Sequence, residues 1–436
     1  MQEIVETGGD NLRMKDIHVT DFPRSAQISD PPGKVITRES SRSATSYGWF
    51  IAGVSTWFTA IGMQGVLFSW LVVSVLHAEA KWVGIAQSAL MLPAVVLLLI
   101  GGAIADRYDR RNLLIALHLI ATLLSASLVF VVASDNLSLS MLFVYAFGMG
   151  SVQAFVMPAR DALLSEVAGP NLMRAVAGLT LAQWGTQALG ALVAGAARWI
   201  GTVPALGLHA LILLSGVPTL GRLPSLPRQH TSQRHLHFTD VAAGVREVLH
   251  SPPLLSAFLL VTAVGTLFIG PFLVVFPILV RDYYGGDVSQ LALLNMAFPT
   301  GTILGSLALL WRGRMRRKGL AQLLALLSGA GCLGAVSLGL PLWGTLVAIC
   351  VWGIGAAIVS NAGRTLFQEQ APPSHRARVL SVYMFGFMGA AGVIGAPLSG
   401  VLVQRIGPLA TCTVASSVMV AVVLYTFVFT KVARIE

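Results

Sequence analysis

The sequence predicts an all-α membrane protein in which twelve transmembrane helices form two pseudo-symmetric bundles of six. Apolar residues make up 55% of the 436 residues and charged residues only 11%, whereas soluble domains carry about 25% charged residues. The apolar residues come in uncharged runs of about 20, the length that crosses the hydrocarbon core of a bilayer. The alternating segments of about 10 residues that a membrane β-barrel requires are absent. A polar stretch at residues 222–251 leaves six runs on each side.

Hydropathy along the chain places the twelve predicted spans between charged or turn-forming connections. Each of them is long enough to cross a bilayer as a helix. The expected spans are residues 49–76, 83–105, 112–133, 139–160, 174–198, 202–221, 254–280, 288–311, 319–339, 343–364, 379–402 and 407–430.

The polar segments divide the chain into four predicted parts. Residues 1–46 contain prolines and a Ser/Arg run but no apolar core, which predicts a disordered cytoplasmic tail and no cleavable signal peptide. Residues 47–221 and 252–432 are the two six-helix bundles. Residues 222–251, which include an amphipathic stretch, are a cytoplasmic linker between them.

Lysine and arginine are distributed unequally between the two sides of the predicted membrane. Of the 29 basic residues, 25 fall on the side of the N-terminus, and the others are Lys81, Arg198, Arg281 and Arg405. Cytoplasmic loops collect basic residues, so both termini are expected in the cytoplasm, with the chain in a bacterial-type inner membrane. The net charge of +10 therefore reflects orientation and does not indicate nucleic-acid binding.

The two halves of the sequence resemble copies of one another. Arg160 and Arg364 each close a fourth span at a separation of 204 positions, and Arg174 and Arg378 open fifth spans at the same separation. Two parallel six-helix halves with a site at their interface are a known transporter plan. The glycine-rich fifth and eleventh spans are either static packing surfaces or an interface on which the halves move. Glycines paired at offsets of 204 or 205 are Gly185 with Gly389, Gly190 with Gly395, and Gly195 with Gly400.

The sequence indicates no metal, cofactor or catalytic group. It has no HExxH or GxSxG motif and no carboxylate pair suited to catalysis, so an enzyme is not expected. Linker histidines lie near one another without a converging cysteine or carboxylate, which favours a polar linker; they are His230, His235 and His237. The cysteines lie inside predicted spans without metal-ligand or disulfide spacing, which favours packing; they are Cys332, Cys350 and Cys412.

A short charged connection joins the second and third predicted spans, and reads Gly102-Ala-Ile-Ala-Asp106-Arg107-Tyr-Asp109-Arg110-Arg111. It resembles the signature that the major facilitator superfamily carries between helices two and three. Two further segments are similar to the drug- and siderophore-export branch, which includes the enterobactin and macrolide exporters. They are Pro158-Ala-Arg160-Asp161-Ala-Leu-Leu and Gln370-Ala-Pro-Pro-Ser-His-Arg376-Ala-Arg378-Val-Leu-Ser. The superfamily resemblance covers about residues 47–432 and implies a twelve-helix transporter fold.

The resemblance also implies a conformational gating latch at the cytoplasmic side. Asp106 would accept hydrogen bonds from the N-terminus of the eleventh helix, and Arg107 would pair with Asp161. Arg110 and Arg111 are expected mainly to set orientation. The corresponding loop of the second half, residues 312–318, has no carboxylate, so the gate is expected to be asymmetric. The residues assigned to the latch are Gly102, Asp106, Arg107, Arg110, Arg111 and Asp161.

Polar side chains inside spans are costly in lipid, so they tend to face a cavity, although glutamine can also join helices. Mid-span polar residues and their aromatic or apolar neighbours, Phe272 among them, are therefore candidates for a substrate cavity. A cavity without carboxylates suits neutral, amphipathic or anionic molecules. Arg160 and Arg364 could attract anions at its inner mouth, or they only set orientation. The cavity candidates are Gln64, Gln153, Gln183, Trp184, Gln187, Asn295, Asn361, Tyr383, Phe385 and Met388.

Proton coupling is implied by the resemblance alone, because the sequence places no carboxylate near mid-span. Histidine titrates near neutral pH, which makes two histidines inside spans the candidates for coupling. They are His118 and His209. A span histidine is also compatible with a purely structural packing role.

The sequence thus predicts a monomeric secondary transporter that exports a small amphipathic molecule by alternating access. Its expected partners are this small-molecule substrate, membrane lipids and, through the resemblance, protons. The alternatives are an importer or a lysolipid or metabolite transporter of the same fold, a membrane enzyme, and a non-transporting scaffold or sensor. Fold alone determines neither the direction of transport nor the substrate.

Overall fold

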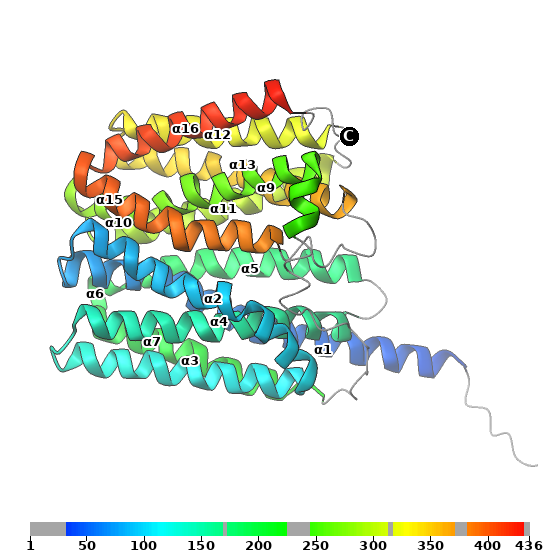
Figure 1. Ribbon diagram of the computed structural model, residues 1–436. Helices are drawn as coiled ribbons and strands as arrows, with labels where there is room; N and C mark the ends of the chain where they lie inside the picture. The colour runs from blue at the N-terminus through cyan, green and yellow to red at the C-terminus, as the bar shows by residue number, and fades with distance from the viewer. Residues whose placement is uncertain (1–31, 169–171, 225–244, 313–316, 371–381, 431–436) are drawn as a thin grey trace, which may run out of the picture. The chain divides into compact units, whose positions relative to one another are not determined.

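The computed structural model describes the backbone of residues 32–168, 172–224, 245–312, 317–370 and 382–430. Side chains are described for the same residues except 32–44, 98–107 and 364–370. The regular elements in these ranges are helices, as the sequence predicts. From α2 onward the helices run side by side (Figure 1).

The first bundle consists of the helices from α1 to α7. α1 continues directly into a π-helical turn, η1, and the short α6 follows α5 after two residues. The bounds are Pro32–Trp70 for α1, Leu71–Val75 for η1, Ala80–Arg107 for α2, Arg110–Ala133 for α3, Leu139–Val167 for α4, Leu172–Ala194 for α5, Ala197–Ile200 for α6 and Thr202–Gly221 for α7.

The second bundle consists of the helices from α9 to α16, preceded by a helical turn at residues 245–250. α9, η2 and α10 form one continuous helix, and η3 continues into α15. The bounds are Pro252–Val264 for α9, Gly265–Ile269 for η2, Gly270–Asp282 for α10, Val288–Arg312 for α11, Lys318–Ser337 for α12, Leu342–Gln370 for α13, Phe385–Gly395 for η3, Ala396–Ile406 for α15 and Pro408–Phe429 for α16.

Local sequence explains where several helices begin. Asp109 and Ser138 accept backbone N–H groups of the first turns of α3 and α4 and so cap these helices. α7 and α16 each follow a glycine with positive φ, Gly201 at 88° and Gly407 at 85°. Glycine adopts this backbone conformation without steric cost. Matching helices of the two bundles therefore start in the same way.

Eleven helical segments in the described part of the chain are long and apolar enough to cross a membrane. They coincide with eleven of the twelve predicted spans. The remaining span is α5, which is 23 residues long but carries the strongly polar Gln183 and Gln187. α5 packs against α11, and Gly62 of α1 lies against its backbone at Gln187. The prediction of two six-helix membrane bundles is confirmed.

α1 begins at Pro32, so it includes residues 32–46, which the sequence assigns to a disordered tail. Proline is well tolerated in the first turn of a helix. No glycine or proline interrupts residues 34–47, so nothing in that stretch breaks the helix. Residues 1–31 and the linker histidines lie outside the described residues.

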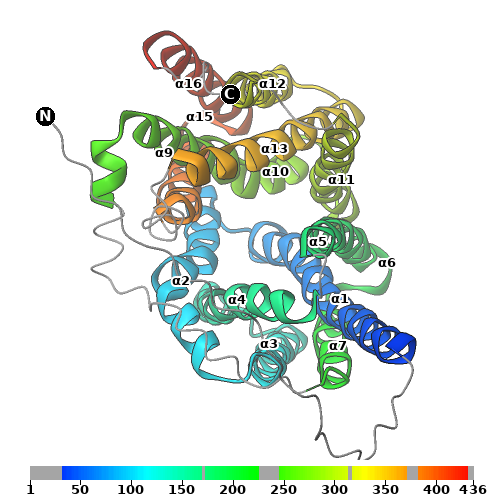
Figure 2. The ribbon, with the colours of Figure 1, turned by 90° about the vertical axis from the view of Figure 1, so that its right-hand side faces the viewer.

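Matching pairs of helices pack together in the two bundles. α2 packs on α4 as α11 packs on α13, and α3 packs on α7 as α12 packs on α16. The bundles meet along two seams that are related in the same way, α5 against α11 and α15 against α2 (Figure 2). Each of α2 and α11 contains one proline inside the helix, Pro93 and Pro299. The pseudo-symmetry predicted from the repeated arginines and glycines is confirmed.

One pair of the repeated glycines lies at contacts within each bundle. A Cβ built on Gly190 of α5 would lie 1.9 Å from the carbonyl oxygen of Thr59 of α1. A Cβ built on Gly395 would lie 2.8 Å from the carbonyl oxygen of Gly265, on the equivalent pair of helices. Helix backbones in lipid approach this closely only where small residues allow it.

Another pair of the repeated glycines lies on the seams between the bundles. Gly195, just after α5, lies against Ala292 of α11, and Gly400 of α15 lies against the backbone of Ala80 at the start of α2. The glycine-rich spans therefore pack helices within a bundle and also lie where the bundles meet, and movement of the halves on this interface stays a prediction. One pair packs helices within a bundle, and the other pair lies where the bundles meet.

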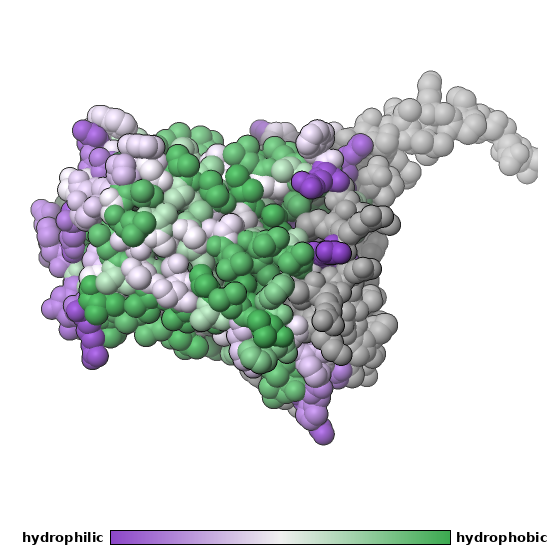
Figure 3. Space-filling model, turned by 90° about the horizontal axis from the view of Figure 1, so that it is seen from above, coloured by the Kyte–Doolittle hydropathy of each residue, from purple (hydrophilic) through white to green (hydrophobic). Residues whose placement is uncertain are grey.

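The face of the molecule shown in Figure 3 is largely hydrophobic, with hydrophilic residues toward its ends. Exposed tryptophans occur near the helix ends: Trp199 is 75% exposed, Trp343 70% and Trp311 93%. Tryptophan is enriched at both interfaces of a membrane. We call the end of the bundles that carries the α3–α4 and α12–α13 connections the outer end. The end that carries the α2–α3 connection is the inner end. Both names follow the predicted orientation.

Candidate functional site

An ion pair joins the two bundles at the outer end. Nη1 of Arg198, in α6, lies 2.9 Å from Oδ2 of Asp287, which directly precedes α11. Oδ1 of Asp287 accepts the backbone N–H of Ser289 at 2.9 Å, so the same carboxylate caps α11. Burial alone would raise the pKa of Asp287, but hydrogen bonds from Ser289 and Gln290 and the charge of Arg198 hold it below its usual value.

Asp287→Asn is expected to have a small, pH-dependent effect. Asparagine keeps the cap but loses the charge, and Arg198 and Asp287 are 54% and 35% exposed, so we expect a loss of about 0.2–1 kcal/mol. Because the native pKa lies below the usual value of 3.8, the stabilisation is complete above that pH and is lost as the pH falls through the native pKa. The difference in free energy of unfolding between wild type and variant, measured by thermal unfolding, should be the same at every pH from 8 to 5. A difference that vanishes between pH 7 and 6 would contradict this.

A matching contact lies on the other seam. Nε2 of Gln404, in α15, donates to Oε2 of Glu79, just before α2, at 3.1 Å. Nζ of Lys81 lies 2.8 Å from the same oxygen, and its hydrogen bond and charge hold the pKa of Glu79 below its usual value. Glu79 precedes α2 as Asp287 precedes α11, so the two seams are closed by equivalent positions. One seam uses an arginine and the other an amide.

A third contact at the outer end joins the last turns of two equivalent helices. Nη1 of Arg281, in α10, donates to the backbone oxygen of Val73, in η1, at 2.6 Å. The guanidinium also binds Asp282, with Nη2 2.9 Å from Oδ2. Lys81, Arg198 and Arg281 are three of the four basic residues that the sequence places outside. In the sequence these residues indicate orientation only, and their rarity on that side is the one signal that singles them out.

At the inner end, two arginines bind neighbouring helices of the first bundle. Arg110 forms an ion pair with Glu166, near the end of α4, and the two side chains are only 16% and 17% exposed. Arg111 donates from Nε to the carbonyl oxygen of Leu220 at 3.2 Å and from Nη2 to that of Gly221. The last carbonyls of a helix lack intrahelical partners, so Arg111 caps α7. Both arginines, expected from the sequence mainly to set orientation, therefore also join helices of the first bundle.

Three residues of the predicted latch, Gly102, Asp106 and Arg107, belong to α2. Their side chains lie outside the described part of the structure. The expected contacts of Asp106 with the eleventh helix and of Arg107 with Asp161 therefore stay predictions. The Asp161 side chain is 57% exposed and is paired with Arg160.

Arg160 is a buried cation between three helices of the first bundle, with 9% of the residue exposed. Nε and Nη2 donate to Oδ1 of Asp161 at 2.9 and 2.6 Å, and Nη1 donates to Oε1 of Gln183 at 3.2 Å. The guanidinium carbon lies 5.3 Å from the ring centre of Phe58, within the range of cation–π attraction. Side chains from α1, α4 and α5 thus meet at one charge.

Two predicted cavity residues lie on the seam between α5 and α11. Trp184 packs edge-on against Phe298, with ring centres 6.4 Å apart. Nδ2 of Asn295 donates to the carbonyl oxygen of Leu291 at 3.0 Å. Oδ1 of Asn295 is directed at α1, where it would lie 3.7 Å from a Cβ built on Gly65. Both residues contact the opposite bundle.

Phe298 belongs to a cluster of aromatic rings in the second bundle. The rings of Phe268, Phe272 and Phe298 lie 5.2, 5.9 and 5.7 Å from that of Trp352, in α13. Such edge-on pairs are favourable beyond their burial of apolar area. Phe272 is a candidate from the sequence but Trp352 is not, because local sequence does not show which aromatic rings of other helices a ring will contact. With Trp184, these rings form an aromatic cluster beside Asn295.

The other predicted cavity residues are dispersed. Asn361 and Phe385 are exposed. Tyr383 is buried in a small apolar cluster with Val248, Leu254, Ala257, Val261 and Val382. The half-buried candidates are Gln153, Gln187 and Met388.

His118 is buried between α1, α3 and α7, with 1% exposed. Its Nδ1 donates to the carbonyl oxygen of Leu114 at 2.8 Å, and its ring meets that of Trp57 edge-on at 5.3 Å. A Cβ built on Gly216 of α7 would lie 2.4 Å from the same ring. These contacts hold the ring in one orientation.

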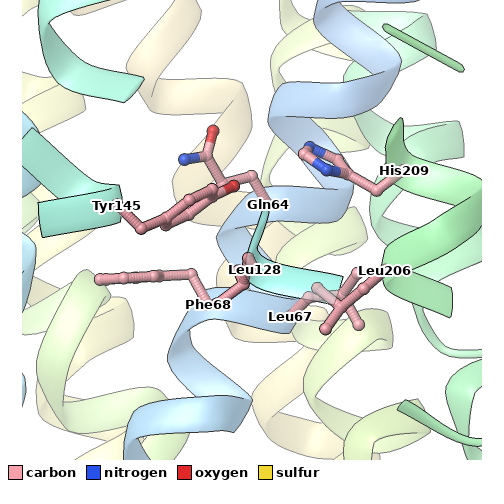
Figure 4. A pocket seen from close by; sticks show the side chains of 7 residues that line it. All are labelled: Gln64, Leu67, Phe68, Leu128, Tyr145, Leu206 and His209. Carbon is pink, nitrogen blue, oxygen red and sulfur yellow. The ribbon is translucent and has the colours of Figure 1, made fainter. Parts of the chain in front are cut away.

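The second histidine lies in a crevice inside the first bundle (Figure 4). Gln64 and Tyr145 lie side by side, and His209 faces them from α7. Nε2 of Gln64 and Nε2 of His209 are buried without a hydrogen-bond partner in the described structure. The crevice is too narrow to hold a water molecule, so it is not the substrate cavity. It is lined by Gln64, Leu67, Phe68, Leu128, Tyr145, Leu206 and His209.

The three cysteines are free and lie in α12, α13 and α16, where Cys412 is fully buried. Among the described residues no group of three or more His, Cys, Asp or Glu is placed to hold a metal ion.

The sequence profile of the Major Facilitator Superfamily matches residues 49–393, which include most of both bundles. The chain belongs to this superfamily. Macrolide efflux protein A of Streptococcus pyogenes is 24% identical over 338 residues, which are 75% of this chain and 80% of the relative. The enterobactin exporter EntS of Shigella flexneri is 26% identical over 375 residues, which are 82% and 84% of the two chains. The predicted resemblance to this superfamily and to its exporters is confirmed.

Solved structures show the same fold at low identity. The nucleoside transporter NupG, as a point mutant, matches with a TM-score of 0.74 and 12% identity over 88% of this chain and 99% of its own. A POT family transporter in complex with 5-aminolevulinic acid matches with a TM-score of 0.67 and 15% identity over 89% and 96%. The superfamily and the fold are those of transporters, and this chain is a multi-pass membrane transporter.

Proposed function

We propose that this transporter exports a small amphipathic molecule by alternating access, with the two bundles as its moving halves. The observation that carries the proposal is the set of contacts at the outer end. Arg198 with Asp287, Gln404 with Glu79, and Arg281 with Val73 all connect the first bundle to the second. These contacts use exposed or half-exposed side chains, and such pairs are worth little individually. They are therefore suited to a closure that forms and breaks during a cycle.

The composition of the seam supports an amphipathic substrate. The half-buried rings of Trp184, Phe272 and Phe298 offer apolar surface, and Asn295 and Gln183 offer polar groups beside it. Binding sites for small molecules are mostly apolar with a few placed polar groups. The direction of transport is proposed from the two relatives named for efflux and export.

Proton coupling belongs to the same proposal. Among the described residues the buried charged side chain is Arg160, and no Asp or Glu is buried. If a side chain in the described spans carries the proton, His118 and His209 are the candidates. Replacing each by Asn should show this: a carrier variant loses transport driven by a pH gradient but retains exchange of substrate across the membrane without a gradient. Variants that retain both activities would remove the histidines from coupling.

We further propose a monomer in a bacterial-type inner membrane, with both termini and the linker at residues 222–251 in the cytoplasm. The unequal distribution of basic residues supports this orientation. In it, the face opposite the outer-end contacts is the cytoplasmic one. Surrounding lipids would contact the exposed apolar side chains of both bundles.

The test is uptake into inside-out membrane vesicles, which converts export into accumulation. The panel contains siderophores, macrolides and lysolipids, each with and without a pH gradient. We expect accumulation of at least one amphipathic compound above vesicles without the protein. Accumulation only in right-side-out vesicles would show an importer, and uptake of lysolipids alone would show a lipid transporter. No uptake of any compound in either orientation would contradict the proposed function.

A further inference from the structure

Arg160 is the only buried Lys, Arg, Asp or Glu among the residues whose side chains are described. It lies in α4, a helix long and apolar enough to span the membrane. Charged side chains inside spans are expensive and are typically found at substrate or ion pathways. Arg110 and Arg111 join α3 to α4 and α7 at the inner end, whereas Arg160 contacts α5 and α1.

Among the residues whose side chains are described, the guanidinium of Arg160 has binding capacity that no partner uses. It has five N–H groups in a planar fork, and its hydrogen bonds to Asp161 and Gln183 use three of them. Gln183 contributes a neutral oxygen and Phe58 a ring face, so neither neutralises the charge. The charge is balanced by Asp161 alone among these contacts.

Asp161 is a counter-ion that can be displaced. Its side chain is 57% exposed, whereas that of Arg160 is 11% exposed. The two residues are neighbours in sequence, and adjacent side chains on a helix do not face one another. An exposed carboxylate keeps most of its hydration when it leaves a partner, so its separation from Arg160 costs little.

We propose that Arg160, together with Gln183, binds an anionic group of the transported molecule, which replaces Asp161 on the guanidinium. A carboxylate, sulfonate or phosphate matches the fork of arginine. Trp184, which follows Gln183 in sequence and is half-buried beside Phe298, suits an apolar or aromatic body attached to the anion. The substrate class is therefore an anionic amphipath. This inference rests on the proposed transport function and narrows it.

A purely structural role for Arg160 makes a different prediction. If the side chain only joins α4 to α5 through Gln183, its loss weakens binding of charged and neutral ligands alike. If it binds an anion, its loss affects the charged ligand alone, and removal of the competing carboxylate of Asp161 improves binding of that ligand. The two residues of one ion pair should then have opposite effects.

The test compares two fluorescent probes that differ in one group, N-dansyl-leucine with a carboxylate and N-dansyl-leucinamide without a charge. Both are titrated onto the full-length purified protein in lipid nanodiscs. For wild type we expect the acid to bind about tenfold more tightly than the amide, the effect of one charge-assisted hydrogen-bonded pair. Arg160→Gln should bind both probes equally, and Arg160→Lys should retain part of the preference because it keeps the charge without the fork.

Asp161→Asn should bind the acid several-fold more tightly, by about the strength of one displaced ion pair, and the amide as wild type does. Arg174→Gln is the matched control, because Arg174 is exposed on α5 near the same end of the first bundle. It should behave as wild type. The inference would be overturned if wild type bound the two probes equally or bound neither. It would also be overturned if Arg160→Gln lost the same amount of affinity for both probes.

Failure of this inference is distinguishable from failure of the proposed function. Uptake by inside-out vesicles of a neutral or cationic compound, with no preference between the two probes, would leave the export function standing and remove only the anion site. No uptake of any compound would remove the function itself. Uptake limited to anions, abolished in Arg160→Gln and retained in Arg174→Gln, would support both.

Discussion

Gly190→Val is expected to destabilise the first bundle severely. The added Cβ would lie 1.9 Å from the carbonyl oxygen of Thr59, and the obstacle is backbone that cannot turn aside. Overpacking in well-packed cores costs about 1–3 kcal/mol and occasionally more. Because α5 would have to move away from α1, we expect about 3 kcal/mol or more and loss of transport. Thermal unfolding of the purified variant in lipid nanodiscs measures the effect.

Gly185→Val is the matched control on the same helix. Nothing lies within 4 Å of a Cβ built on Gly185, so the same change of residue type should leave unfolding almost unchanged. Equal destabilisation by both substitutions would mean that α5 tolerates no valine for reasons of helix propensity. The close approach of α5 to α1 would then not be the cause.

The second large effect is expected at the Arg110–Glu166 pair. Both side chains are partly buried at the inner end, at 16% and 17% exposed. Arg110→Gln leaves the carboxylate of Glu166 without its cation, and because this pair lies between the exposed and the fully buried cases we expect a loss of about 1–3 kcal/mol. The double variant with Glu166→Gln removes both charges and should recover most of this loss. Thermal unfolding of the two single variants and the double variant gives the coupling energy.

Arg174→Gln serves as the control for this cycle as well, since it removes an exposed basic residue of α5. It should leave unfolding within about 0.5 kcal/mol of wild type. If the double variant loses as much stability as the two single variants of Arg110 and Glu166 together, the two charges do not stabilise one another. The contact between α3 and α4 would then depend on apolar packing alone.

The membrane spans could be predicted from the sequence because each is an uncharged run bounded by charged or turn residues. The repeat could be predicted because glycines and arginines recur at nearly one offset. The structure adds what the repeat does: Gly190 and Gly395 bring helices together within a bundle, and Gly195 and Gly400 lie between bundles. Spacing alone could not separate these, because both pairs lie on the same two spans.

The partners of charged side chains could not be predicted from the sequence. Arg198 and Asp287 are far apart in the chain and meet only because two helices of different bundles end side by side. Arg160 looks in the sequence like one more basic residue at a span end, yet it is buried against Phe58 and Gln183. Gln64 and His209 were assigned separate roles but line one crevice (Figure 4). Such pairings depend on tertiary packing, which local sequence does not encode.

The most direct test of the central claim is a distance measurement across the outer end. Spin labels at Asn136→Cys and Leu338→Cys, in a background without the three native cysteines, report the separation of the two bundles at their exposed outer connections. Labels at Asn136→Cys and Ile200→Cys report a distance within the first bundle. Alternating access predicts two populations for the first pair, whose balance shifts when a transported compound is added, and a single distance for the second. One unchanging distance across the bundles, with and without that compound, would contradict the account.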